Sequence, residues 1–109
     1  MFPAGAVSWL QSNEQPVILF NEYNWGGYLI YNLPDEKVFV DGRTDLYGDD
    51  ILAEYVSIMK AGEGWNVLLG DYGVDTLLLE RDSTLEYVAQ LEGWKVVFRD
   101  ATSVVLREP

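Results

Sequence analysis

Residues 21–50, NEYNWGGYLIYNLPDEKVFVDGRTDLYGDD, decide the fold that this chain is expected to adopt. Two short apolar runs, Val17 to Phe20 just before this stretch and Val38 to Val40 within it, each end abruptly in polar residues. Such runs are typical of parallel strands that are buried on both faces. Ligands of open α/β sheets bind beyond the carboxyl ends of parallel strands. We therefore expect the polar residues that follow the two runs to meet in one crevice.

The composition indicates one domain, residues 1–109, and excludes several kinds of chemistry. The net charge of −11 repels phosphate backbones, so we expect no nucleic-acid partner. The chain has no Cys and no His, which removes thiol nucleophiles, imidazole bases and most zinc sites. We expect no catalytic residue, cofactor or bound metal in this domain. No apolar stretch reaches the ~20 residues that span a bilayer, so the isolated chain is expected to be soluble.

Hydrophobic periodicity divides the chain into alternating helices and strands. Stripes of apolar residues predict helices near residues 3–12, 25–33, 51–59, 65–72 and 84–91, and apolar runs predict strands near 16–20, 37–41, 75–80, 94–99 and 103–107. This order predicts a three-layer α/β fold with helices on both faces of a mainly parallel sheet of about five strands. The last two strands are close enough to form an antiparallel hairpin at the sheet edge.

Local signals mark several ends of these elements. Gly73 stands where a left-handed helix cap belongs, and Ser83 with Glu86 forms a capping-box pattern. Gly26 and Gly27 fit the first turn of their helix better than its interior, because glycine destabilises a helix interior by about 1 kcal/mol relative to alanine. We expect Lys95, Arg99 and Arg107 to protect the edge of the hairpin.

The candidate ligand site combines the residues after the first two strands. It contains Tyr23, Asn24, Trp25, Gly26, Gly27, Asp41, Arg43, Asp45 and Tyr47. Arg43 either pairs with Asp41 or points into the crevice to bind a carboxylate or phosphate. Trp25 and Tyr28 share a helical stripe, so the alternative for both is a place in the core. Tyr23, Tyr31 and Tyr47 are better candidates for a surface that stacks on a sugar ring or contacts a lipid-facing group.

The acidic loop leaves a second function open. Asp41 and Asp45, with Asp49 and Asp50, could bind a hard cation in a small metal-dependent phosphohydrolase. Acidic residues in the first turn of a helix also complement its dipole, which is the commoner role. The segment VFVDGRTD resembles the strand element of rhodanese-like domains, whose sulfur-carrying cysteine is absent here, so only a catalytically inactive binding module fits. It is less similar to the D-x-D-G-T motif of haloacid-dehalogenase-type phosphatases.

Three motifs carry a wider resemblance: N-W-G-G-Y-L, D-G-R-T-D-L-Y-G-D and Y-G-V-D-x-L-L-L. In that order and spacing, the chain resembles the soluble C-terminal domain of large bacterial polytopic membrane proteins related to GT-C glycosyltransferases. The resemblance covers nearly the whole chain. It implies a domain on the extracytoplasmic face of the bacterial cell membrane, excised from a protein whose transmembrane part holds a lipid-linked sugar site and the catalytic acids.

A fainter similarity runs to the W-W-D-Y-G region of oligosaccharyltransferase catalytic subunits. Tyr23, Asn24, Trp25 and Gly26 would take its second to fifth positions, whereas Glu22 replaces the first tryptophan and Asn24 replaces the aspartate. Together the two resemblances imply a non-catalytic accessory domain that binds or orients an acceptor. Its implied partners are the transmembrane portion of the same polypeptide and a glycan, a lipid-linked sugar or an acceptor peptide.

Overall fold

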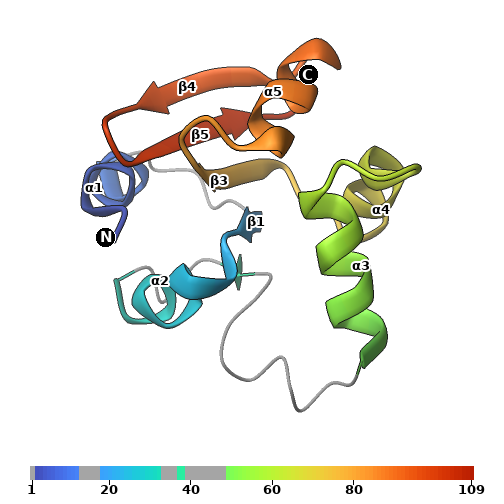
Figure 1. Ribbon diagram of the computed structural model, residues 1–109. Helices are drawn as coiled ribbons and strands as arrows, with labels where there is room; N and C mark the ends of the chain where they lie inside the picture. Colours follow the sequence, from blue (N-terminus) through green and yellow to red (C-terminus); the bar gives the residue numbers. More distant parts are fainter. Residues whose placement is uncertain (1, 13–17, 33–36, 39–48) are drawn as a thin grey trace.

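A central sheet with the strand order β2-β1-β3-β5-β4 organises the protein (Figure 1). The computed structural model describes residues 2–12, 18–32, 37–38 and 49–109. The strands are β1 (Ile18–Asn21), β2 (Lys37–Val38), β3 (Thr76–Glu80), β4 (Lys95–Arg99) and β5 (Ser103–Arg107). The helices are α1 (Ala4–Ser12), the short 3₁₀ helix η1 (Tyr23–Trp25), α2 (Gly26–Asn32), α3 (Asp49–Met59), α4 (Trp65–Asp71) and α5 (Thr84–Leu91). The predicted sequence of helices and strands is confirmed.

The expectation of a mainly parallel sheet is wrong, because the sheet is mixed. β1 pairs in parallel with β2 on one side and with β3 on the other. β5 pairs antiparallel with both β3 and β4. The C-terminal hairpin lies at the edge as expected, but its second strand, β5, enters between β3 and β4. β5 is the one strand that runs in the opposite direction. Because it has a neighbour on each side, two of the four strand pairings are antiparallel.

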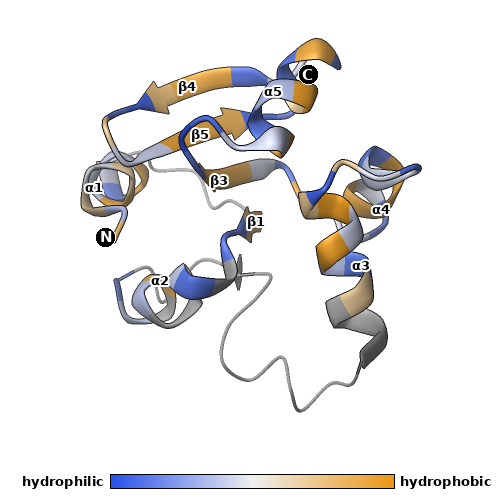
Figure 2. Ribbon diagram, viewed as in Figure 1, coloured by the Kyte–Doolittle hydropathy of each residue, from blue (hydrophilic) through white to orange (hydrophobic). Residues whose placement is uncertain are grey.

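Apolar side chains of β1, β3 and β5 point alternately to the two faces of the sheet, and each face is covered by helices. On one face Phe20, Leu77 and Leu79 pack with residues of α3, α4 and α5. On the other face Leu19, Leu78 and Val105 pack with α1 and α2. Figure 1 shows these helices on opposite sides of the strands, and Figure 2 shows the hydrophobic residues of β3 and β5 between them. The core is therefore divided by a central strand, β3, that is buried on both faces.

The helix caps read from the sequence act where they were expected, whereas Arg107 does not protect the sheet edge because β5 lies between β3 and β4. Gly73 has a φ of +73°, a left-handed conformation that glycine adopts at little cost. The Ser83 hydroxyl accepts the Glu86 backbone N–H at 3.3 Å. The Glu86 carboxylate turns back to accept the backbone N–H of Asp82 at 3.0 Å, one residue before the cap. Arg99 does more than protect the edge, since its guanidinium pairs with Asp82 and Glu86.

Leu78 gives a direct test of this packing. Its side chain is fully buried among α1, α2 and β5. Leu78→Ala should lower the free energy of unfolding by about 2–5 kcal/mol, because it removes buried methyl groups and leaves a cavity. Val67→Ala on the exposed surface of α4 is the control and should change stability by less than about 0.5 kcal/mol. Equal effects of both substitutions in urea unfolding would contradict the assigned core.

Candidate functional site

The polar ends of β1 and β3 meet at one edge of the sheet. Parallel pairing places Asn21, the last residue of β1, opposite Leu78 in β3. The next residue, Glu22, donates its backbone N–H to the Leu78 carbonyl at 3.3 Å. Its carboxylate in turn accepts the backbone N–H of Glu80 at 3.0 Å. Glu22 therefore ties the chain that leaves β1 to the carboxyl end of β3.

The turn after Glu22 carries the aromatic part of the predicted site. The Glu22 carbonyl accepts the backbone N–H of Trp25 at 3.1 Å, which closes the turn. Trp25 is only 3% exposed and packs in the core between α1, α2 and the sheet. Asn24 is exposed on the same turn. The core alternative for Trp25 is thus correct, although Trp25 is also one of the residues that line the cleft described below.

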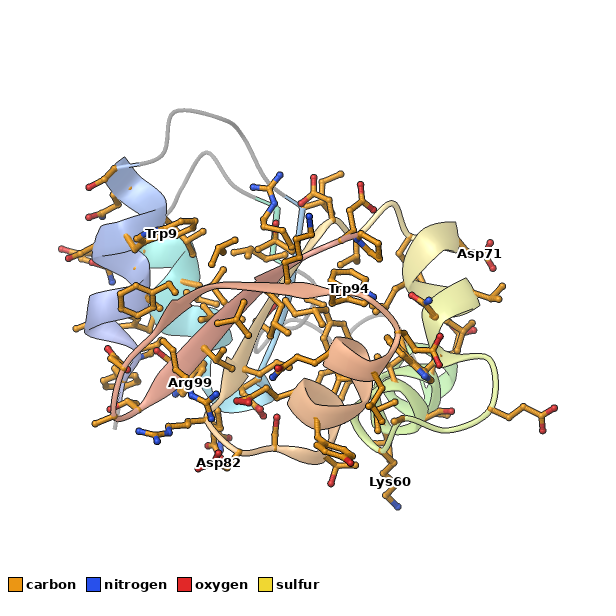
Figure 3. All side chains as sticks on the ribbon, turned by 90° about the horizontal axis from the view of Figure 1, so that it is seen from above. Trp9, Lys60, Asp71, Asp82, Trp94 and Arg99 are labelled. Atoms are coloured by element: carbon orange, nitrogen blue, oxygen red, sulfur yellow. The ribbon has the colours of Figure 1, made fainter. Side chains whose placement is uncertain are left out.

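The turn after β3 is held in an unusual backbone conformation. Asp82 has a φ of +66°, a left-handed value that non-glycine residues adopt rarely. Its carboxylate accepts an N–H of Arg99 at 2.9 Å (Figure 3) and lies 3.6 Å from the Arg81 guanidinium. The same Arg99 group lies 3.3 Å from the buried carboxylate of Glu86. These contacts fix the direction in which Arg81 and Asp82 leave the sheet.

The turn between β4 and β5 forms the opposite wall. Asp100 accepts the backbone N–H groups of Thr102 and Ser103, each at 2.9 Å. The Ser103 and Thr102 backbone N–H groups hold the pKa of the Asp100 carboxyl below its ordinary value. The Thr102 carbonyl accepts the Arg81 backbone N–H at 3.2 Å. This hydrogen bond joins the wall to the turn after β3.

The three turns enclose an open cleft of about 310 Å³, which we call the rim cleft. It is lined by Trp25, Glu80, Arg81, Asp82, Ala101 and Thr102. The side chains of these residues include an indole, two carboxylates, a guanidinium and a hydroxyl. The residues that line the rim cleft therefore include both donors and acceptors of hydrogen bonds.

Two carboxyl groups, those of Glu22 and Glu80, lie close together where β1 and β3 end. Burial raises the pKa of the Glu22 carboxyl above its ordinary value, the Glu80 backbone N–H lowers it in part, and the nearby Glu80 carboxylate raises it further. Among the described residues, neither carboxylate has an ion-pair partner. The ionised Glu22 is thus less well solvated in the folded protein than in the unfolded chain.

The structure brings together part of the predicted site. Trp25 lines the rim cleft, and Asn24 lies on the turn beside it. Tyr23 belongs to that turn in η1, and Gly26 and Gly27 begin α2 as expected. The remaining predicted residues lie outside the described part of the chain: Asp41, Arg43, Asp45 and Tyr47. The backbone order places β2 beside β1 in parallel, so the expected pairing of the first two strands is confirmed.

Sequence reasoning missed the residues that form most of the rim cleft, from Glu80 to Asp82 and from Ala101 to Thr102. A signal for the first group was present. The apolar run of β3 ends in Glu80, Arg81 and Asp82 just as β1 ends in Asn21 and Glu22. The sequence pattern pairs β1 only with the strand that follows it along the chain, so it does not bring the end of β3 into the predicted site. No comparable signal marks Ala101 and Thr102, which reach the cleft through the position of β5.

The described part of the chain contains no group of three or more carboxylate side chains positioned to hold a metal ion. The phosphohydrolase hypothesis depends on Asp41 and Asp45, which lie outside that part. None of the helices of the described residues is both long enough and apolar enough to cross a bilayer.

The fold has a close structural counterpart. The chain superposes on the crystal structure of the C-terminal globular domain of oligosaccharyltransferase from Archaeoglobus fulgidus with a TM-score of 0.71. The alignment covers 97% of this chain and 95% of that domain, at 9% sequence identity. No protein-family model matches the chain, and no curated protein matches it in sequence. The chain therefore shares the α/β fold of an oligosaccharyltransferase C-terminal domain.

Glu22→Gln tests whether the ionised Glu22 carboxylate destabilises the fold, through the dependence of stability on pH. Because the pKa of Glu22 is raised in the folded state, its protonated form favours folding, and this contribution is lost as the pH rises through the folded pKa. The Gln side-chain oxygen can still accept the Glu80 backbone N–H. We expect Glu22→Gln to unfold a few degrees higher than the parent at pH 7, by about 4–8 °C for each kcal/mol gained. The difference should shrink as the pH falls below the folded pKa.

Glu108→Gln is the control for this measurement, because it removes the same charge from an exposed position near the C-terminus. Its effect on the midpoint of thermal unfolding should be small at every pH. A lower midpoint for Glu22→Gln than for the parent at pH 7 would contradict the assignment of a poorly solvated carboxylate.

Proposed function

We propose that this chain is a non-catalytic accessory domain of a membrane-bound, GT-C glycosyltransferase-like protein. The observation that carries the proposal is the shared fold, since the superposition on an oligosaccharyltransferase C-terminal domain extends over 97% of the chain. The N-W-G-G-Y-L and D-G-R-T-D-L-Y-G-D motifs, whose resemblance leads to the same class of membrane protein, add support. In this proposal the catalytic acids belong to another part of the protein.

The proposed task of the domain is to bind and orient an acceptor at the rim cleft. Peptides and glycans present both donors and acceptors of hydrogen bonds, and the cleft matches them with the carboxylates of Glu80 and Asp82, the Arg81 guanidinium and the Thr102 hydroxyl. These groups stand on turns that are fixed by backbone hydrogen bonds and by the Arg99 ion pairs. Such fixed groups bind a ligand with little loss of conformational entropy.

The proposed site continues from the rim cleft along the edge of the sheet. Asn24 and Tyr23 extend it on the turn after β1, and Gly26 and Gly27 allow a ligand to approach the start of α2. Asp41, Arg43, Asp45 and Tyr47 follow the neighbouring parallel strand in sequence and are proposed as its far end. The proposed partners are the transmembrane portion of the same polypeptide, an acceptor peptide, a glycan or a lipid-linked sugar, at the extracytoplasmic face of the bacterial cell membrane.

Chemical-shift mapping tests this proposal on the isolated chain. Acceptor peptides and soluble oligosaccharides should be titrated separately while backbone amide shifts are recorded. We expect changes to concentrate at Glu22, Asn24, Arg81 and Thr102 for one of these ligands. Uniform silence of these amides with every ligand, or changes centred on α3 and α4, would overturn the assignment of the rim cleft.

Comparing Arg81→Gln with Lys95→Gln shows whether the Arg81 side chain binds the ligand directly or acts only through the net charge of the protein. Arg81 is half exposed, so its replacement should leave the fold intact while it removes a charged hydrogen-bond donor from the cleft. The affinity for the ligand that responds in the mapping should fall about tenfold. Lys95→Gln removes the same charge from the first residue of β4, at the end of that strand opposite to the rim cleft. This variant should leave the affinity unchanged. Equal losses in both variants would indicate only general electrostatics.

A further inference from the structure

The first turn of α1 receives its negative charge from a distant part of the chain. α1 begins at Ala4, and its first turn contains no Asp or Glu. The first N–H groups of a helix have no acceptor within the helix and carry a partial positive charge, so a nearby carboxylate stabilises this end. The carboxylate that lies there belongs to Asp100, in the turn between β4 and β5. Figure 1 shows α1 beside this turn.

Asp100 approaches α1 at Gly5, where only a residue without a side chain leaves room for it. A Cβ atom on Gly5 would overlap Oδ2 of Asp100 and would lie 3.2 Å from the Phe98 ring. Glycine is the residue that allows such a close approach to the backbone. The Oδ2 atom therefore rests on the backbone of α1, and any larger residue at position 5 would have to displace it.

The other oxygen of the Asp100 carboxylate binds the turn itself. Oδ1 accepts the backbone N–H groups of Thr102 and Ser103, each at 2.9 Å, and the Ser103 hydroxyl at 3.3 Å. Three donors on one oxygen fix the orientation of the carboxylate. Oδ2 can leave α1 only if the carboxylate rotates or the whole turn moves, and either change disturbs these hydrogen bonds. One side chain thus connects the β4–β5 turn to the first turn of α1.

The turn that Asp100 holds is one wall of the rim cleft. Ala101 and Thr102 line the cleft, and the Thr102 carbonyl accepts the Arg81 backbone N–H at 3.2 Å. A displacement of Asp100 would therefore reach Thr102 through the backbone hydrogen bond that they share. It would then reach Arg81 on the other side of the cleft through the Thr102 carbonyl. The position of α1 and the shape of the cleft are linked by this chain of contacts.

α1 itself is anchored to the sheet by contacts that do not involve Asp100. The Trp9 ring packs by the Phe98 ring of β4, with their centres 6.3 Å apart. Three further side chains of the helix are buried in the core cluster on this face of the sheet: Ala6, Val7 and Leu10. Ala101, at the tip of the turn, is exposed by contrast. The contact at Gly5 therefore sets the position of the turn rather than that of the helix.

We propose that Gly5 and Asp100 are positioning residues of the rim cleft, through which α1 holds the Thr102 wall in place opposite Arg81. The inference rests on the proposed function only for the use of the cleft, since the contact between Gly5 and Asp100 is present without a ligand. Neither residue lines the cleft, so neither is expected to touch a ligand. A ligand that contacts both Arg81 and Thr102 meets them at a fixed separation, which reduces the entropy lost on binding.

Alanine at residue 5 tests the link without any ligand. Gly5→Ala places a methyl group where Oδ2 lies, so amide chemical shifts should change at Thr102, Ser103 and Arg81 as well as in α1. Gly70→Ala in α4 is the matched control, because a Cβ there meets none of the described residues beyond its own helix within 4 Å. The control should leave these three amides unchanged and raise the midpoint of thermal unfolding by about 2–5 °C. Gly5→Ala should lower the midpoint instead.

A second substitution shows whether the carboxylate carries the effect. Asp100→Ser keeps a side-chain oxygen that can accept the N–H groups of the turn, but it has no atom at the position of Oδ2. Adding Gly5→Ala to Asp100→Ser should therefore not lower the unfolding midpoint or shift the Thr102 and Arg81 amides further. The same loss from Gly5→Ala with either residue at position 100 would overturn the proposal. Unchanged Thr102 and Arg81 amides in Gly5→Ala alone would overturn it as well.

Ligand titrations separate this proposal from the proposed function. With the same acceptor peptides and soluble oligosaccharides, Gly5→Ala should weaken the binding of the responding ligand about threefold or more, whereas Gly70→Ala should not. Unchanged affinity of Gly5→Ala for a ligand that binds in the cleft would overturn the positioning role and leave acceptor binding in place. If every ligand is silent at the cleft, acceptor binding is refuted, and the shifts of Thr102 and Arg81 alone decide whether α1 positions the wall.

Discussion

The parallel pairing of β1 with β3 is the constraint on which the rest of the structure depends. Residues 19–21 lie opposite residues 76–78, and the Glu22 backbone continues the ladder to the Leu78 carbonyl. This register sends two polar turns out of the same edge of the sheet. A slip of one residue would exchange the faces of β1, because side chains alternate along a strand. The Trp25 turn and the Glu80–Asp82 turn would then no longer form one cleft.

The same pairing connects the rim cleft to the helices α1 and α2. Trp25 packs with both helices in the core, and it lines the cleft beside Glu80. A ligand in the cleft would consequently touch the element from which α2 starts. In the proposed function, the charged lining of the cleft selects the ligand.

Much of the fold followed from local chemistry in the sequence. The apolar runs of β1 and β3 were recognisable because each ends sharply in polar residues, and Gly73 and Ser83 marked helix ends through their backbone and side-chain preferences. The order of the strands was less accessible. Whether β5 lies at the edge or between β3 and β4 depends on packing against Leu77 and Leu79, which no local pattern records. For this reason Trp25 was identified as a site residue, whereas Arg81 and Thr102 were not.

Native-state hydrogen exchange of the Glu22 and Glu80 amides tests the central claim most directly, because both amides donate only within the junction of β1 and β3. If the junction is part of the rigid sheet, both amides should exchange with the free energy and denaturant dependence of the Leu78 amide in the middle of β3. Fast exchange of Glu22 and Glu80 through a small local opening, while Leu78 stays protected, would show that the rim cleft is not built on the sheet and would contradict the account.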